Sequence, residues 1–217
     1  MAMQSATTEI EKHVHIKSGS ASLGGILAVP HDAAGIVVFA HGAGSSRFSP
    51  RNTFVAEVLQ AHGMGVLLMD LLTPAEDLSH HKRFDIDLLS SRLMAAREWL
   101  KQQEELRGLS IGLFGASTGA AAALKVAASL GKDIGAVVSR GGRPDLAVDA
   151  LPQVLCPTLL IVGGKDSETL DLNEKALQKL TAVKRLEIVP GATHLFEEPG
   201  TLDQVAYLAN AWFAKYL

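Results

Sequence analysis

The stretch Leu113-Phe114-Gly115-Ala116-Ser117-Thr118-Gly119 decides the fold of this chain. An apolar run typical of a buried strand ends in Gly-x-Ser-x-Gly, and a helical pattern of small residues follows at once. This pattern is typical of a sharp strand-to-helix turn that carries the serine at its tip. Glycine suits the positions two residues before and after Ser117, because so tight a turn leaves no room for a Cβ. The other interpretation is a Gly-rich turn in which Ser117 only caps the helix.

On both sides of this turn, short β-branched runs alternate with longer helical patterns. Several runs, such as residues 66–69 and 159–162, are apolar on both faces, which a parallel sheet covered by helices requires. Since parallel neighbours are joined by right-handed crossovers, the sequence predicts an α/β fold with a doubly wound, mostly parallel eight-stranded sheet. The predicted strands are residues 13–17, 22–29, 35–40, 65–71, 109–114, 134–139, 157–162 and 185–189. The predicted helices are residues 50–62, 85–104, 118–130, 170–180 and 199–216.

Length and composition limit the classes of protein to consider. The 217 residues are 47% hydrophobic, so we expect a single domain over residues 1–217 with a flexible tail at residues 1–9. A net charge of −3 offers no basic excess for nucleic acid, and no apolar run is long enough for a membrane span. The polar N-terminus lacks a signal-peptide pattern, and Cys156 has no partner for a disulfide. We therefore expect a cytoplasmic monomer or homodimer.

A serine hydroxyl becomes a nucleophile when a base takes its proton and an acid orients that base. His194 follows the last predicted strand, and Asp166 follows the strand before it. The order Ser117, Asp166, His194 is the one expected for this serine turn. Taken singly, Asp166 also suits a helix cap and His194 an ordinary loop. Asp145, one strand earlier, is the rival acid, although it equally suits a turn after Pro144.

The negative oxygen that forms during acyl transfer needs two hydrogen-bond donors. One is the backbone N–H of Thr118, the residue after the serine. The other should come from the His-Gly-Ala-Gly loop after the strand at residues 35–40, and we predict the amide of Ala43, with Gly44 as the alternative. Glycines here let the backbone approach the substrate closely.

Together the Gly-Ala-Ser-Thr-Gly turn, the His-Gly-Ala-Gly loop, Gly-Gly-Lys-Asp and Gly-Ala-Thr-His resemble the α/β-hydrolase superfamily. The short chain looks like the dienelactone-hydrolase-like branch of small serine hydrolases and carboxylesterases, from about residue 10 onward. This resemblance implies that Ser117 is the nucleophile, His194 the base and Asp166 its orienting acid. Dienelactone hydrolases carry cysteine where this chain has Ser117, which favours ordinary ester hydrolysis over dienelactone cleavage.

Two patterns imitate cofactor sites. Gly42-x-Gly44 after a strand, with Asp70 ending the next, covers half of a dinucleotide fingerprint, but Arg47 stands where the third glycine belongs. Metal-binding histidines would need acidic or cysteine partners at suitable spacing. The histidine pairs without such partners are His13 with His15 and His80 with His81. We therefore expect neither a cofactor nor a metal.

Arginines after the strand ends give a clue to the substrate. They are Arg47, Arg51, Arg140 and Arg143. Such residues could pair with a carboxylate on the substrate, so we expect a preference for small acidic or polar acyl esters. The substrate-binding candidates are Gly42, Gly44, Arg47 and Arg140. The alternative is that the arginines pair with local acids such as Asp145.

These observations predict a serine hydrolase that cleaves small carboxylic esters through an acyl-enzyme. A thioesterase, lactonase, acyltransferase or peptidase would use the same residues. The alternative from a different class is a non-catalytic binding protein on a hydrolase fold. Only residues 140–156 separate two strands where larger hydrolases insert a lid, so we expect an open cleft without a lid domain.

Overall fold

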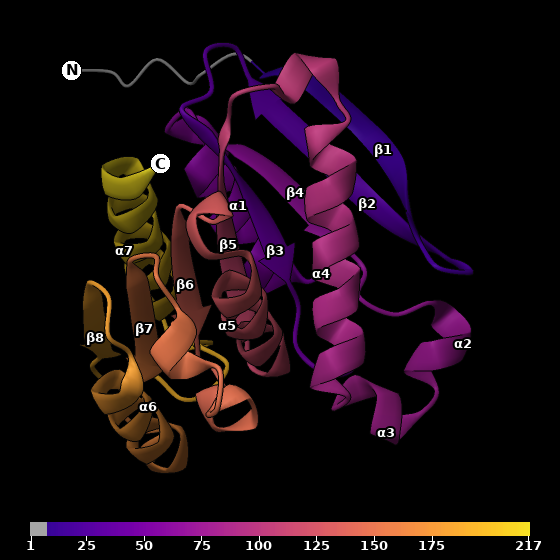
Figure 1. Cartoon of the computed structure of the whole chain (residues 1–217). Helices are drawn as coiled ribbons and strands as arrows, with labels where there is room; N and C mark the ends of the chain where they lie inside the picture. Colours follow the sequence, from indigo (N-terminus) through magenta and orange to yellow (C-terminus); the bar gives the residue numbers. More distant parts are fainter. Residues whose placement is uncertain (1–7) are drawn as a thin grey trace, which may run out of the picture.

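The strands form one sheet in the order β1-β2-β4-β3-β5-β6-β7-β8 (Figure 1). The computed structural model describes residues 8–217. The strands are β1 (Thr8–Ser18), β2 (Ala21–Pro30), β3 (Gly35–Ala40), β4 (Gly65–Met69), β5 (Ser110–Ala116), β6 (Ala136–Arg140), β7 (Thr158–Gly163) and β8 (Lys184–Val189). The helices are α1 (Pro50–Ala61), α2 (Pro74–Asp77), α3 (His80–Arg83), α4 (Ile86–Lys101), α5 (Thr118–Leu130), α6 (Ser167–Lys179) and α7 (Thr201–Tyr216).

The strand directions confirm the predicted doubly wound, mostly parallel sheet. β2 pairs antiparallel with both β1 and β4, and every pair from β4 to β8 is parallel. The carboxyl ends of β3, β5, β6, β7 and β8 therefore meet at one edge of the sheet, where a ligand of such a sheet binds.

The edge strand β1 begins earlier than the predicted residues 13–17. Val14 and Ile16 are buried on the face that α4 covers, whereas the polar residues that alternate with them are exposed. Of the predicted flexible tail, residues 1–9, residues 1–7 lie outside the described residues. Thr8 and Glu9 already belong to β1.

Helices bury one apolar layer on each face of the sheet. α4, α5 and α6 cover one face, and α1 and α7 cover the other (Figure 1). α5 lies close to the sheet because its first turns consist of small, fully buried residues, Ala120, Ala121, Ala122 and Ala123. On the opposite face the rings of Phe39 and Phe114 pack with their centroids 4.9 Å apart. These two layers hold the strand ends rigidly, as a functional site requires.

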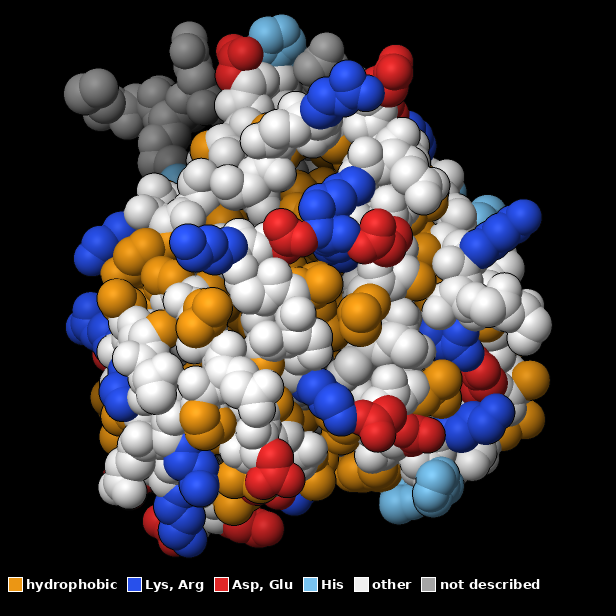
Figure 2. Space-filling model, in the orientation of Figure 1, with side chains coloured by type: hydrophobic (Ala, Val, Ile, Leu, Met, Phe, Trp, Pro, Cys, Tyr) orange, Lys and Arg blue, Asp and Glu red, His pale blue; other side chains and the backbone are white. Residues whose placement is uncertain are grey.

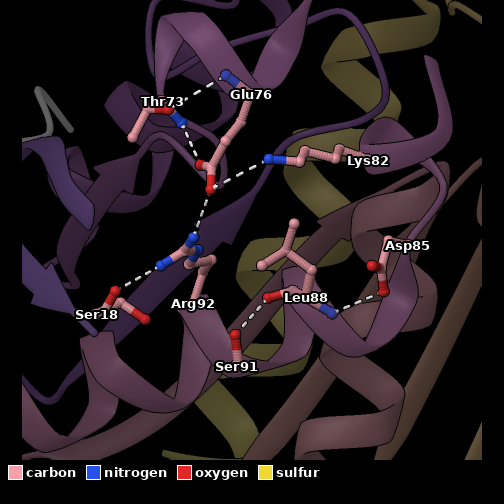
Figure 3. Close-up of polar contacts among 8 residues, drawn as sticks. All are labelled: Ser18, Thr73, Glu76, Lys82, Asp85, Leu88, Ser91 and Arg92. Atoms are coloured by element: carbon pink, nitrogen blue, oxygen red, sulfur yellow. Dashed lines mark hydrogen bonds and ion pairs between the residues drawn. The ribbon is translucent and has the colours of Figure 1, made fainter. Parts of the chain in front are cut away.

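Between β4 and α4 the chain forms two one-turn helices that hydrophobic periodicity does not predict. Thr73 and Glu76 make a capping box at the start of α2 (Figure 3), with Glu76 N–H donating to Thr73 Oγ1 at 3.2 Å and Thr73 N–H to Glu76 Oε2 at 2.9 Å. Arg92 of α4 donates to Glu76 Oε1 at 2.8 Å and to the Ser18 carbonyl at 2.6 Å. This network ties the α2–α3 segment to α4 and to the end of β1.

Within the described residues, no inserted domain covers the carboxyl ends of the strands. Between β6 and β7 the chain makes only two short 3-10 turns, Pro144–Ala147 and Leu151–Gln153. The absence of a lid is therefore confirmed. Figure 2 shows acidic, basic and hydrophobic side chains interspersed on the face seen in Figure 1. None of the helices in residues 8–217 has the length and apolar character needed to cross a membrane.

Candidate functional site

Ser117 lies at the tip of the sharp turn between β5 and α5. Its backbone has φ 50° and ψ −119°, a region that non-glycine residues rarely occupy and that costs on the order of 1–3 kcal/mol. A Cβ at Gly119 would collide with the Ala40 carbonyl, and one at Gly115 with the backbone of Ala120. The two glycines therefore let α5 and β3 approach closely enough to enforce the strained turn.

Hydrogen bonds from neighbouring loops hold the strained serine backbone. Ser117 N–H donates to the Arg140 carbonyl at 3.3 Å. The Ser117 carbonyl accepts from Ala120 N–H and Arg143 N–H, each at 3.1 Å. Strain of this kind persists only where the surroundings over-determine the conformation. The turn thus exposes the hydroxyl in a fixed position.

His194 lies in the loop after β8 and is oriented by Asp166. Its Nδ1 lies 2.6 Å from Asp166 Oδ2, and the Asp166 side chain is only 13% exposed. The two loops are joined by a hydrogen bond from Lys165 N–H to the Ala192 carbonyl at 2.9 Å. With Nδ1 bonded to the carboxylate, Nε2 is the nitrogen left to exchange a proton.

Asp145, the rival acid, is engaged elsewhere. Arg143 donates to both of its carboxylate oxygens, at 2.8 and 2.7 Å. This bidentate ion pair agrees with the alternative interpretation of the sequence, in which arginines near the strand ends pair with local acids. The geometry therefore favours Asp166 as the partner of His194.

Ser117 and His194 line the same pocket, which has a volume of about 210 Å³. Gly42, Ala43 and Ser45 of the loop after β3 form one wall, and Ser49, Arg51 and Asn52 at the start of α1 form another. The remaining lining residues are Ala116, Arg140 and Leu195. Small-molecule pockets in proteins are commonly about 300–1,000 Å³, so this one suits a small ligand.

The loop after β3 passes directly beside the serine. A Cβ at Gly42 would lie 3.1 Å from the Ser117 Cβ, so glycine is needed for this close approach. Ala43, the next residue, lines the pocket, whereas Gly44 does not. Thr118 is buried at the first position of α5. The two predicted oxyanion donors, the amides of Ala43 and Thr118, thus belong to segments that flank Ser117.

His41 fixes this loop from beneath and was not singled out from the sequence. Its Nε2 accepts a hydrogen bond from Leu71 N–H at 3.0 Å, so Nδ1 carries the proton that bonds the Gly42 carbonyl at 2.9 Å. Burial lowers the pKa of His41, outweighing the Gly42 carbonyl and the charges of Asp70 and Asp77. His41 is therefore a neutral positioning residue, and its place directly before Gly42 was the signal available in the sequence.

The four arginines near the strand ends have different environments. Arg140 and Arg51 line the pocket. Arg47 forms an ion pair with Asp70, and its guanidinium packs against Gly24. Arg47 is not among the lining residues, and its hydrogen bonds tie the loop after β3 to the end of β4. Of the two arginines named as substrate-binding candidates, the structure brings Arg140 to the Ser117 pocket and places Arg47 outside its lining.

Asn52 and Phe196 complete the surroundings of the site and were also not identified from the sequence. Asn52 is 2% exposed, and its Oδ1 has no hydrogen-bond partner in the described part of the chain. Phe196 is fully buried at φ 56°, an uncommon conformation for a bulky residue, two positions after His194. Neither residue belongs to a recognisable motif, because their roles depend on tertiary contacts.

Comparisons with known proteins agree with this architecture. The model of the Dienelactone hydrolase family matches residues 23–215. A dienelactone hydrolase from Anabaena variabilis is 54% identical with a TM-score of 0.93, over 96% of this chain and 98% of that one. XC6422 from Xanthomonas campestris, an α/β serine hydrolase without lid, is 19% identical with a TM-score of 0.76, over 97% of this chain and 96% of that one. At that identity the likeness to XC6422 shows the fold alone.

The curated relatives are longer proteins. A protein of Mycobacterium tuberculosis with the name "Putative phosphoribosyl transferase" is 54% identical over 207 residues, which are 95% of this chain and 47% of that protein. The chain therefore spans about half the length of the curated relatives it matches.

Proposed function

The chain belongs to the dienelactone hydrolase family, and on this premise we propose that it is a serine hydrolase that cleaves small carboxylic esters through an acyl-enzyme. One observation carries the proposal: Ser117, on a strained turn, lines the same pocket as a histidine hydrogen-bonded to Asp166 at 2.6 Å. A nucleophile, a base and an orienting acid are the groups that acyl transfer requires.

The proposed reaction has two stages. Ser117 Oγ attacks the ester carbonyl carbon while His194 Nε2 takes the hydroxyl proton. The carbonyl oxygen becomes negative and accepts hydrogen bonds from the N–H groups of Thr118 and Ala43. When the bond to the alcohol oxygen breaks, His194 returns its proton to that oxygen. Water then attacks the acyl-enzyme with His194 as base, releasing the carboxylic acid and restoring Ser117.

Lactones and thioesters would react by the same steps, and the Anabaena relative carries the name dienelactone hydrolase. We place ordinary small esters first because a serine stands at the nucleophile position and the pocket is small and without a lid. The transferase name belongs to proteins of which this chain covers 47%. A serine, a histidine and an aspartate at one pocket support hydrolysis as the proposal for this chain.

The proposal is tested by hydrolysis of p-nitrophenyl acetate, a phenyl thioacetate and a small lactone. Ser117→Ala and His194→Ala should each lower kcat by at least about a thousandfold, and Asp166→Asn by less. Ser129→Ala is the matched control, because this serine is exposed on α5 and its hydroxyl donates to the Lys125 carbonyl at 3.0 Å. Full activity in Ser117→Ala would contradict the proposal. If Asp145→Asn were damaging and Asp166→Asn mild, the assignment of the acid would be wrong.

A further inference from the structure

Arg140 is a buried arginine beside the nucleophile. It ends β6, in register with Ala116, and its carbonyl accepts the hydrogen bond from Ser117 N–H. Alternation along β6 places its side chain on the same face as Val138, beneath α1 and α7. The residue is 7% exposed, and that remaining surface faces the Ser117 pocket.

No acidic group of the described residues neutralises Arg140. Its Nε is enclosed without a hydrogen-bond acceptor, and neither an ion pair nor a hydrogen bond links the side chain to another part of residues 8–217. The guanidinium carbon of Arg140 lies over the Phe196 ring, 5.8 Å from the ring centroid and near the outer limit for a cation–π contact. Burial, and then the charge of Arg51, lower the pKa of Arg140 to about 10.

The other two buried arginines of the described residues have carboxylate partners, which Arg140 lacks. Arg92 bonds Glu76 at 2.8 Å, and Arg97 pairs with Glu98 and Asp133. Buried charges in proteins are ordinarily paired in this way, because an isolated one is strongly unfavourable. Of the three buried arginines in residues 8–217, Arg140 alone lacks a carboxylate partner, and it lines the pocket.

The rest of the pocket lining also carries positive charge. Arg51, at the start of α1, is 30% exposed, and its partner Glu197 lies 3.1 Å away on the solvent side, 62% exposed. Of the described residues that line the pocket, two are arginines and none is aspartate or glutamate. The pocket is therefore complementary to a negative charge.

Resting on the proposed function, we propose that Arg140 binds an oxyanion, a carboxylate or a phosphate, carried by the ester that Ser117 cleaves. A planar guanidinium binds both groups through paired hydrogen bonds. Because the pocket is about 210 Å³ and the Arg140 backbone contacts that of Ser117, the anion lies only a few bonds from the ester carbonyl. Arg51, which lines the same pocket, supplies further N–H donors to the same group.

A matched pair of esters tests the site, p-nitrophenyl butyrate against the mono-p-nitrophenyl ester of succinate. They differ only in a terminal methyl or carboxylate. The wild type should prefer the succinate ester in kcat/KM. Arg140→Met should reduce the ratio of the two kcat/KM values about 10- to 100-fold, as expected for losing a charge-assisted pair, whereas Arg140→Lys should retain part of it. Arg107→Met, at an arginine whose side chain is 78% exposed, is the control and should leave the ratio unchanged.

Titration calorimetry on Ser117→Ala distinguishes a carboxylate from a phosphate as the bound anion. It also tests the anion site separately from the proposed ester hydrolysis. Binding of succinate alone identifies a carboxylate ester, and binding of inorganic phosphate alone a phosphorylated one; either should weaken at least about tenfold when Arg140→Met is added. If neither anion binds and the ester ratio is unchanged in Arg140→Met, the anion site is wrong, even where Ser117-dependent hydrolysis stands. If an anion binds through Arg140 but no ester is cleaved, the proposed function fails and the anion site stands.

Discussion

Arg140 is costly to the free protein because its charged form loses hydration without gaining a carboxylate. Burial lowers its pKa to about 10, so the charged side chain is penalised in the folded state at every pH below that value. We therefore predict that Arg140→Met raises the free energy of unfolding by about 2 kcal/mol. The gain should be the same at pH 6 as at pH 9 and is measured by urea denaturation. A variant less stable than the wild type would show that Arg140 is compensated in the free protein.

His41 should make the free energy of unfolding depend on pH in the mildly acidic range. Because burial lowers the pKa of His41 in the folded protein, the unfolded chain takes up a proton at a higher pH than the folded protein does. Stability that is present above about pH 6.5 is therefore lost as the pH falls. Between pH 7.5 and 5.5 the wild type should lose about 1 kcal/mol more than His41→Gln. His81→Gln, at an exposed position in α3, is the control and should behave as the wild type. Identical pH profiles for the wild type and His41→Gln would contradict the neutral buried His41.

At the level of elements, the α2–α3 segment supports the loop that carries Ala43. A second small cavity is lined on one side by His41, Gly42 and Ala43 and on the other by Asp77 and Arg83. Arg83 donates to both carboxylate oxygens of Asp77, at 2.9 and 3.0 Å. The segment depends on Arg92 for its attachment to α4, as Figure 3 shows. Weakening the attachment of the α2–α3 segment to α4 should therefore disturb the position of the loop that carries Ala43.

We predict that Arg92→Met destabilises the protein by about 2–3 kcal/mol, because it leaves Glu76 partly buried without its main cation. Burial by itself would raise the pKa of Glu76, but hydrogen bonds from Thr73 and the charge of Arg92 outweigh it and lower that pKa. Lys82→Met is the matched control: Lys82 lies 4.0 Å from the same carboxylate and is 45% exposed, so its loss should cost less than about 0.5 kcal/mol. Equal effects of the two variants on urea unfolding would contradict this account.

Across the whole molecule, patterns that repeat along the chain were enough to predict the sheet. Runs that are apolar on both faces predict buried parallel strands, and Gly-x-Ser-x-Gly predicts the turn at Ser117. The pairing of His194 with Asp166 follows from strand ends that meet at one edge. These signals are local, so a single sequence contains them.

Features that depend on tertiary contacts could not be predicted in this way. The helices α2 and α3 have four residues each, too few for a periodic signal. Arg47, Arg140 and Arg143 all follow strand ends, yet two of them find a nearby acid and Arg140 does not. Which arginine stays unpaired depends on the residues, distant in the sequence, that pack around it, and the segment that carries the arginine does not contain that information.

The central claim is that Ser117 forms a covalent acyl-enzyme, and intact-protein mass spectrometry after mixing with p-nitrophenyl acetate tests it most directly. Quenching the wild-type reaction in acid within seconds of mixing preserves the acyl-enzyme for observation, because acid stops the base-assisted attack of water. We predict a mass increase of one acetyl group, located on the peptide that contains Ser117 and missing in Ser117→Ala. Acetylation at another residue, or hydrolysis that persists in Ser117→Ala, would contradict the account.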